Sequence, residues 1–200
     1  MEEKGKIVPF TLEQVKVVYD TWLVRDFPGE EVKPFKNIQS MWHSGNYYAL
    51  GLYSDANELL GYALFVKVEE VPMLLLDYFA VLEPYRKQGI GSYFLQQLRE
   101  QAGEQIAGIF IETEDVSFAE TQQELLERTR RDCFYEKNGA EYTGMTSAVY
   151  DARYRIYVLP CKTDQTSEMY LSFIQKIYQF MLSGEKYEKY VFFFCSSECL

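Results

Sequence analysis

Residues 77–92 read Asp-Tyr-Phe-Ala-Val-Leu-Glu-Pro-Tyr-Arg-Lys-Gln-Gly-Ile-Gly-Ser, and this stretch is the most informative in the sequence. Its first half is typical of an apolar strand, and its glycines open a helix whose apolar residues fall on one side. Glycine lets the backbone turn sharply and approach a ligand, and the N–H groups at a helix start attract anions. Arg86 and Lys87 add positive charge suited to phosphate. The stretch therefore predicts a pyrophosphate cradle between a strand and a helix.

Outward from this stretch, hydrophobic periodicity and turn residues predict a series of strands and helices. We predict strands at residues 6–10, 47–53, 59–68, 72–81, 107–112, 141–150, 154–159 and around 190–194. We predict helices at residues 11–25, which would begin at a capping box of Thr11 and Gln14, 34–43, 91–102, 118–137 and 167–182. The strands at 72–81 and 107–112 flank a helix, so they should lie side by side and parallel.

The loop that opens the helix resembles the signature of the GNAT superfamily of N-acetyltransferases, which is Gln or Arg, two residues, Gly, any residue, then Gly or Ala. Here it reads Arg86-Lys-Gln-Gly-Ile-Gly91, between an apolar strand and an amphipathic helix. A second segment, Arg131-Asp-Cys-Phe-Tyr-Glu-Lys-Asn-Gly139-Ala140, is similar to the family's Leu/Phe-Tyr-x-x-x-Gly-Phe segment. The Gly-Lys-Ser/Thr ending of nucleotide-hydrolase loops and the Rossmann glycine pattern are absent from this sequence.

The resemblance covers residues 6–159 and implies an α+β fold, the GNAT fold, with a mixed, twisted and splayed sheet flanked by helices. It divides the chain into an acyltransferase domain at residues 1–160 and an extension at residues 161–200. The extension is expected to form a helix and a short strand, packed on the same domain or on a partner subunit.

The function implied by the resemblance is N-acetyl transfer, in which an acetyl or other acyl group moves from acetyl-CoA to a primary amine. The amine would attack directly, without a covalent acyl-enzyme. The alternative is a non-catalytic acyl-CoA-binding or sensor module on the same fold, motivated by the apolar helix after Pro160. The acceptor, a small-molecule or peptide amine, stays open, as do acyl chain length and oligomeric state; a homodimer is compatible with the sequence.

Two sets of residues receive coenzyme roles from the resemblance. The pyrophosphate would be held by backbone N–H groups, with Arg86 at the first motif position and Lys87 beside it, along Gln88, Gly89, Ile90, Gly91 and Ser92. The pantetheine arm would lie along the end of the strand like an added strand, against backbone groups of Phe79, Ala80 and Val81, one of whose N–H groups would polarise the oxyanion. The alternative for the glycines is a plain helix-entry turn.

Tyr135 matches the tyrosine that acts in this family as general acid for the departing thiolate. A phenol with a pKa of about 10 can donate to a thiolate whose reference pKa is about 8.5. The alternative is one more packed aromatic residue. Arg131 lies one helical turn before Tyr135 and is a candidate coenzyme contact. Arg128 and Arg131 depart from the family's Asn and Ala, and the alternative is ion pairing on a solvated helix face.

A general base is expected at the C-terminal end of the apolar strand, where the amine must lose a proton. Glu112 is our first choice because it directly follows the buried run. Glu114 and Asp77 are the other candidates. Each of these carboxylates could take the proton through water or hold a cationic amine, and the alternative for each is a solvated surface charge.

Composition narrows the partners. The chain has 200 residues and a net charge of −10, and an acidic surface repels nucleic acids and anionic membranes, so neither is expected as a partner. Residues 1–6 mix charges and lead into no long apolar segment, so no export signal is predicted. The four cysteines are therefore expected to be reduced thiols in the cytoplasm. His43 is the only histidine, and no metal site is predicted.

Overall fold

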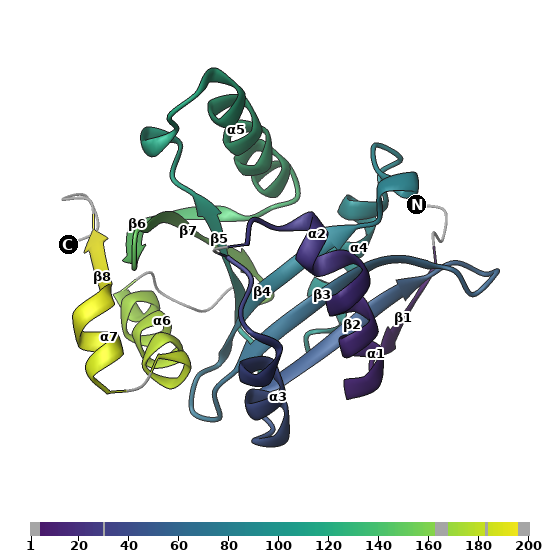
Figure 1. The fold of residues 1–200 in the computed structure, drawn as a ribbon, viewed down its shortest axis with the longest axis horizontal. Coiled ribbons are helices and arrows are strands. Elements are labelled where there is room, and N and C mark those ends of the chain that lie inside the picture. The colour runs from purple at the N-terminus through teal and green to yellow at the C-terminus, as the bar shows by residue number, and fades with distance from the viewer. Residues whose placement is uncertain (1–4, 30, 163–167, 183, 196–200) are drawn as a thin grey trace. The chain divides into compact units, whose positions relative to one another are not determined.

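The computed structural model describes residues 5–29, 31–162, 168–182 and 184–195. Its strands form one eight-stranded sheet in the order β1-β2-β3-β4-β5-β7-β6-β8, and helices flank the sheet (Figure 1). The predicted mixed sheet flanked by helices is confirmed, and β5 follows β4 in the order as predicted. The chain divides into two compact units, residues 1–67 with 76–98 and residues 68–75 with 99–200, so β4 contributes to both.

The first unit begins with a strand, a helical run and a second helix. Its elements are β1 (Lys6–Pro9), α1 (Leu12–Val18), the π-helical η1 (Tyr19–Leu23), α2 (Val24–Asp26), α3 (Phe35–His43), β2 (Tyr47–Tyr53), β3 (Leu59–Lys67), β4 (Met73–Val81), the 3-10 turn η2 (Glu83–Tyr85) and α4 (Ile90–Gln101). Strands β1, β2 and β3 pair antiparallel. In Figure 1, α1, α2 and α3 lie in front of β2 and β3.

Helix α1, η1 and α2 follow one another without a break from Leu12 to Asp26 and are called here the first helical run. Its beginning is set by a local cap. The Thr11 side chain accepts from the N–H of Gln14, and the Gln14 side chain accepts from the N–H of Thr11, so the predicted capping box is confirmed. The run ends at Asp26, close to the predicted end at residue 25. Its middle is π-helical, which sequence periodicity did not indicate. Val15, Val18 and Leu23 are buried and hold the run to the core.

The second unit carries the other half of the sheet. Its further elements are β5 (Gly108–Glu114), the 3-10 turn η3 (Val116–Phe118), α5 (Gln122–Lys137), β6 (Glu141–Val149), β7 (Ala152–Pro160), α6 (Glu168–Met181), α7 (Glu185–Tyr190) and β8 (Val191–Cys195). Strand β7 pairs antiparallel with all seven residues of β5, and β6 pairs antiparallel with β7 and β8. Helix α7 was not predicted.

The predicted start of α5 differs from the structure by four residues, and the predicted end of β5 differs by two. Helix α5 begins at Gln122 rather than 118, because the Thr121 side chain caps it by accepting from the N–H of Glu124. Strand β5 continues to Glu114, so Glu112 lies within the strand, opposite Ile156 of β7. Both differences arise from capping and pairing partners outside the local apolar run.

The C-terminal elements belong to the second unit. Phe173, Ile174 and Ile177 of α6 are buried, and Tyr170 packs edge-on against Phe110 of β5. The division of the chain at residue 160 stays a prediction. Residues 163–167, 183 and 196–200 of the predicted extension, with the predicted helix start at 167, lie outside the described residues.

Gly61 of β3 allows β3 and the end of β4 to approach closely. A Cβ at this position would lie 2.7 Å from the carbonyl oxygen of Ala80, closer than real contacts allow. We expect Gly61→Ala to lower the free energy of unfolding by about 1–3 kcal/mol, because the strands must separate. Urea unfolding measures this. The control is Gly29→Ala, which meets no atom within 4 Å; equal stability of the two variants would contradict the close approach.

Candidate functional site

The predicted phosphate loop lies between η2 and α4, and its backbone is shaped for an anion. Lys87 and Gly89 have left-handed φ angles of 62° and 74°, on either side of Gln88. The first backbone hydrogen bond of α4 runs from the N–H of Tyr93 to the carbonyl oxygen of Gly89, at 3.1 Å. The N–H groups of residues 90–92 precede it, so they have no acceptor within the helix. Alternating φ signs turn successive N–H groups toward one concave surface. The exposed loop therefore fits a pyrophosphate group.

Arg86 at the start of this loop makes contacts within the protein. Its Nε donates to the carbonyl oxygen of Val81 at 2.8 Å, and its guanidinium lies 3.5 Å from Asp26 Oδ1. The side chain thus joins the loop to the end of β4 and to the end of α2. Its predicted coenzyme contact stays a prediction.

The end of β4 is fixed by its neighbours in the first unit. The N–H of Leu82 donates to Leu60 at 2.9 Å, and the Phe79 ring packs on Phe94 of α4 at 5.4 Å. The Ala80 carbonyl faces Gly61, and that of Val81 accepts from Arg86. These contacts make the strand end a rigid edge. The predicted pantetheine contacts of Phe79, Ala80 and Val81 stay predictions.

Asp77 of β4, one of the candidate bases, is buried and forms an ion pair with Lys33. Its side chain is 3% exposed and accepts from Lys33 Nζ at 2.6 Å and from the Tyr47 hydroxyl at 2.6 Å. Burial first, and the Asp77 charge second, raise the pKa of Tyr47 well above its usual value. The backbone N–H of Lys33 also donates to the Tyr78 hydroxyl at 2.8 Å. This network ties the segment before α3 to β4, and it occupies the oxygens that a base would need.

In the second unit, Tyr135 is 8% exposed on α5. Burial raises the pKa of Tyr135 to about 12, while the positive charge of Arg131 opposes that rise. The hydroxyl therefore keeps its proton throughout the neutral range. That protonation state is the one a general acid needs before it donates.

Glu114 is held by both arginines that precede Tyr135 on α5. Arg131 donates to one of its oxygens at 2.6 Å, and the Arg128 guanidinium lies 3.2 Å from the other. Arg128 also pairs with Glu124 at 3.7 Å, as the helical spacing indicated, and donates to the Asp115 carbonyl at 2.8 Å. Arg131 pairs across to β5 rather than along its own helix. Both Glu114 oxygens are therefore bound to cations.

Glu112 contacts hydroxyl groups. The Tyr178 hydroxyl of α6 lies 2.6 and 2.7 Å from its two oxygens, and Ser147 of β6 donates to it at 3.2 Å. Sequence reasoning missed both partners, although Tyr178 stands in an apolar helical stripe, where a buried phenol usually finds an acceptor. The carboxylate is thus held in one orientation. Its role as base stays a prediction.

Comparison with known proteins identifies the family. The family model described as "Acetyltransferase (GNAT) family" matches residues 17–122, more than half of the 200 residues. The chain belongs to this family. No curated protein sequence matches the chain.

Solved structures similar to this GNAT chain include three acetyltransferase relatives. A GNAT-family protein from Bacteroides thetaiotaomicron is 18% identical, with a TM-score of 0.66 over 90% of this chain and 99% of that one. A ribosomal-protein-alanine N-acetyltransferase from Escherichia coli is 18% identical, with a TM-score of 0.57 over 80% and 96%. A dodecameric spermidine N-acetyltransferase from Vibrio cholerae is 7% identical, with a TM-score of 0.57 over 79% and 94%. At these identities the likeness confirms the predicted GNAT fold.

Within residues 5–29, 31–162, 168–182 and 184–195, no three His, Cys, Asp or Glu side chains cluster as metal ligands would. No helix in those same ranges has the length and apolar character needed to span a bilayer. Cys133, Cys161 and Cys195 are free thiols, and Cys199 lies outside the described residues.

Proposed function

We propose that this protein transfers an acetyl or other acyl group from acetyl-CoA to a primary amine by direct attack of the amine. The observation that carries the proposal is the loop at residues 86–92, with its alternating φ angles and its place at the start of α4, in a chain of the GNAT acetyltransferase family. Bound acetyl-CoA would supply the activated thioester.

The residues of the chain would bind, orient and transfer a proton. The amides of residues 88–92 would hold the pyrophosphate, helped by the Lys87 charge. Backbone groups at the end of β4 would align the pantetheine arm, and one N–H there would donate to the thioester oxygen. Tyr135 would donate its proton to the sulfur. With a pKa of about 12 it is a weaker acid than a thiol, so it would donate as the C–S bond breaks rather than before.

Glu112 is the proposed base. Asp77 and Glu114 are bound to lysine and arginine, whereas Glu112 is oriented by the Tyr178 and Ser147 hydroxyls. It would take the amine proton through water or hold the cationic amine. The same contacts also favour the alternative function, a non-catalytic acyl-CoA-binding module, because every carboxylate considered as base is already bound by another side chain.

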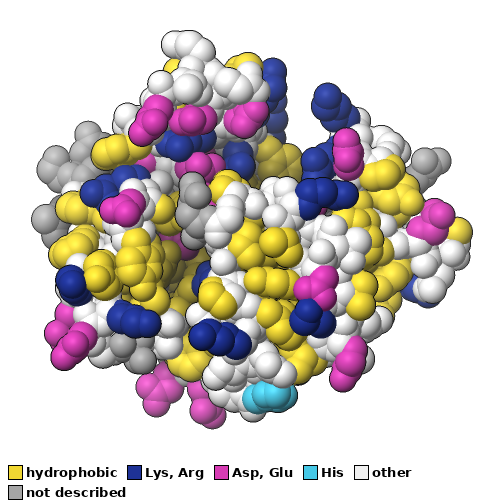
Figure 2. All heavy atoms as spheres, viewed as in Figure 1, with side chains coloured by type: hydrophobic (Ala, Val, Ile, Leu, Met, Phe, Trp, Pro, Cys, Tyr) yellow, Lys and Arg dark blue, Asp and Glu magenta, His cyan; other side chains and the backbone are white. Residues whose placement is uncertain are grey.

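The proposed acceptor is a small-molecule or peptide amine. The family assignment supports this class, and the named activities of two fold relatives, on a protein alanine and on spermidine, are consistent with it. The surface charge says less than the family assignment about which amine is the acceptor. Figure 2 shows acidic and basic side chains interspersed on one face, so the net charge of −10 is not gathered there into one acidic patch.

Titration with acetyl-CoA tests the proposal, followed by thiol release with a panel of amines. We expect a dissociation constant in the range of about 1 μM to 1 mM and one thiol released per amine acetylated. Binding without release on any amine of the panel would support the non-catalytic module. Absence of binding to acetyl-CoA and to longer acyl-CoA compounds would contradict both functions.

A further inference from the structure

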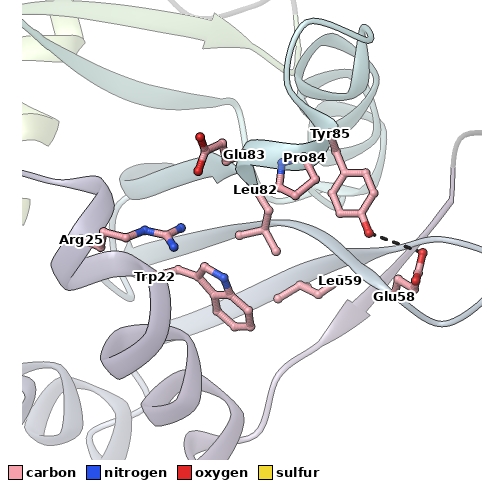
Figure 3. Close-up of a pocket in the computed structure, with 8 residues that line it drawn as sticks. All are labelled: Trp22, Arg25, Glu58, Leu59, Leu82, Glu83, Pro84 and Tyr85. Carbon is pink, nitrogen blue, oxygen red and sulfur yellow. Dashed lines mark hydrogen bonds between the residues drawn. The ribbon is translucent and has the colours of Figure 1, made fainter.

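A pocket separates the end of the first helical run from the turn that leads into the phosphate loop. It has a volume of about 440 Å³, with Trp22 and Arg25 on the helical side and Leu82 and Tyr85 on the side of the turn (Figure 3). Protein interiors fix backbone positions through close packing. Across this pocket the helix end and the turn are not in direct contact, so a polar interaction that joins them would help to set their spacing.

Arg86 supplies that interaction. Its Nε donates to the Val81 carbonyl at 2.8 Å, while its terminal nitrogen lies 3.5 Å from Asp26 Oδ1. The guanidinium is a planar fork with donors in fixed directions, so it can engage both groups at once, which a lysine ammonium does poorly. One side chain therefore joins the first residue of the loop, the last residue of β4 and the last residue of α2.

Asp26 is the fixed end of this connection. Its side chain is 8% exposed, and its Oδ1 is shared between Arg86 and the neighbouring Arg25 at 3.3 Å. Its Oδ2 and the Tyr62 hydroxyl are both buried. Burial raises the pKa of Tyr62, and the Asp26 charge and a side-chain hydrogen bond to Asp26 raise it further. A buried carboxylate is costly unless a cation compensates it. Arg25 and Arg86 therefore compensate the Asp26 charge together, and Asp26 in turn holds the Arg86 guanidinium.

We propose that Asp26 is a positioning residue for coenzyme A: by holding Arg86 against the Val81 carbonyl, it orders the phosphate loop before the ligand binds. The ligand rests on the function proposed above. The family resemblance implies that the Arg86 side chain contacts the coenzyme. In the arrangement proposed here, the Arg86 guanidinium binds Asp26 and the Val81 carbonyl instead, and the loop amides bind the phosphates. The two arrangements make opposite predictions for a variant that releases Arg86.

The test is Asp26→Asn, which keeps the shape of the side chain and removes its charge. We expect the dissociation constant for coenzyme A to rise about tenfold, with turnover at saturating acetyl-CoA changed less than about twofold, because ordering the loop then opposes binding. In the free protein, hydrogen exchange of the hydrogen-bonded amides of Tyr85, Arg86 and Tyr93, at the two ends of the loop, should become faster. The control is Asp20→Asn, on the same helical run, where the carboxylate is exposed and pairs with Lys16.

Arg86→Lys provides an independent variant at a half-exposed position. It should weaken coenzyme A binding as Asp26→Asn does, and the double variant should bind about as well as either single variant. Tighter binding by Asp26→Asn would overturn the proposal, because it would mean that released Arg86 reaches the phosphates. Unchanged loop exchange would also overturn it. The exchange measurement needs no ligand, so it decides this proposal even if the proposed function fails.

Discussion

Gly89→Glu is expected to raise the dissociation constant for acetyl-CoA by at least about 100-fold. Gly89 has a φ of 74°, a conformation in which any side chain is strained. The new carboxylate would stand at the start of α4, where the loop amides are proposed to meet the pyrophosphate, and like charges repel strongly at short range. Isothermal titration of the wild type and the variant measures the change.

Gly103→Glu separates backbone strain from loss of the anion site. Gly103 has a similar φ of 82°, just after α4, and a Cβ there meets no atom within 4 Å. This variant should lose comparable stability and keep its dissociation constant within about twofold. If Gly89→Glu bound acetyl-CoA as tightly as Gly103→Glu, the loop would be a plain helix entry and the phosphate role would be wrong.

Tyr135→Phe is expected to lower turnover by about 100-fold or more while leaving the affinity for acetyl-CoA unchanged, because general acid catalysis contributes on that scale. The ring and its burial are retained, and only the proton donor is lost. Single-turnover thiol release, beside titration with acetyl-CoA, distinguishes the two effects. The matched control is Tyr150→Phe, where the tyrosine is 48% exposed and stacks on Tyr190.

The pH dependence of activity is a second test of Tyr135. Burial raises the pKa of Tyr135 to about 12 in the folded protein, above the value of about 10 in an unfolded chain. The stability that this shift contributes is present below about pH 10 and is lost as pH rises through about 12. Ionisation of Tyr135 should therefore cause no alkaline fall in activity below about pH 11. Unchanged turnover in Tyr135→Phe would contradict the acid role.

Local signals predicted most of the fold. Strands β2, β3 and β4 were placed to within one residue, because turn formers and glycines bound them. Helix α7 and the π-helical segment η1 were missed, because six residues, or a shift in hydrogen bonding inside a helix, leave no clear hydrophobic period. Elements whose limits depend on local backbone chemistry could thus be predicted.

The candidate site was predicted only where a local motif defines it. The loop glycines and Tyr135 lie in such motifs. The partners of the candidate bases do not: Lys33 contacts Asp77 across 44 residues of sequence, and Tyr178 contacts Glu112 across 66. Such pairs form only when tertiary packing brings distant elements together, so the spacing of residues in the sequence does not predict them.

The pairing of β5 with β7 limits how the chain can be shortened for expression. A fragment trimmed to the family match, residues 17–122, would begin inside α1 and stop at the first residue of α5. It would lack β7, so the apolar β5 would present a bare edge along Gly108–Glu114. Bare apolar edges recruit other chains and aggregate. Soluble fragments should therefore extend to Cys195, where the last described strand closes on β6.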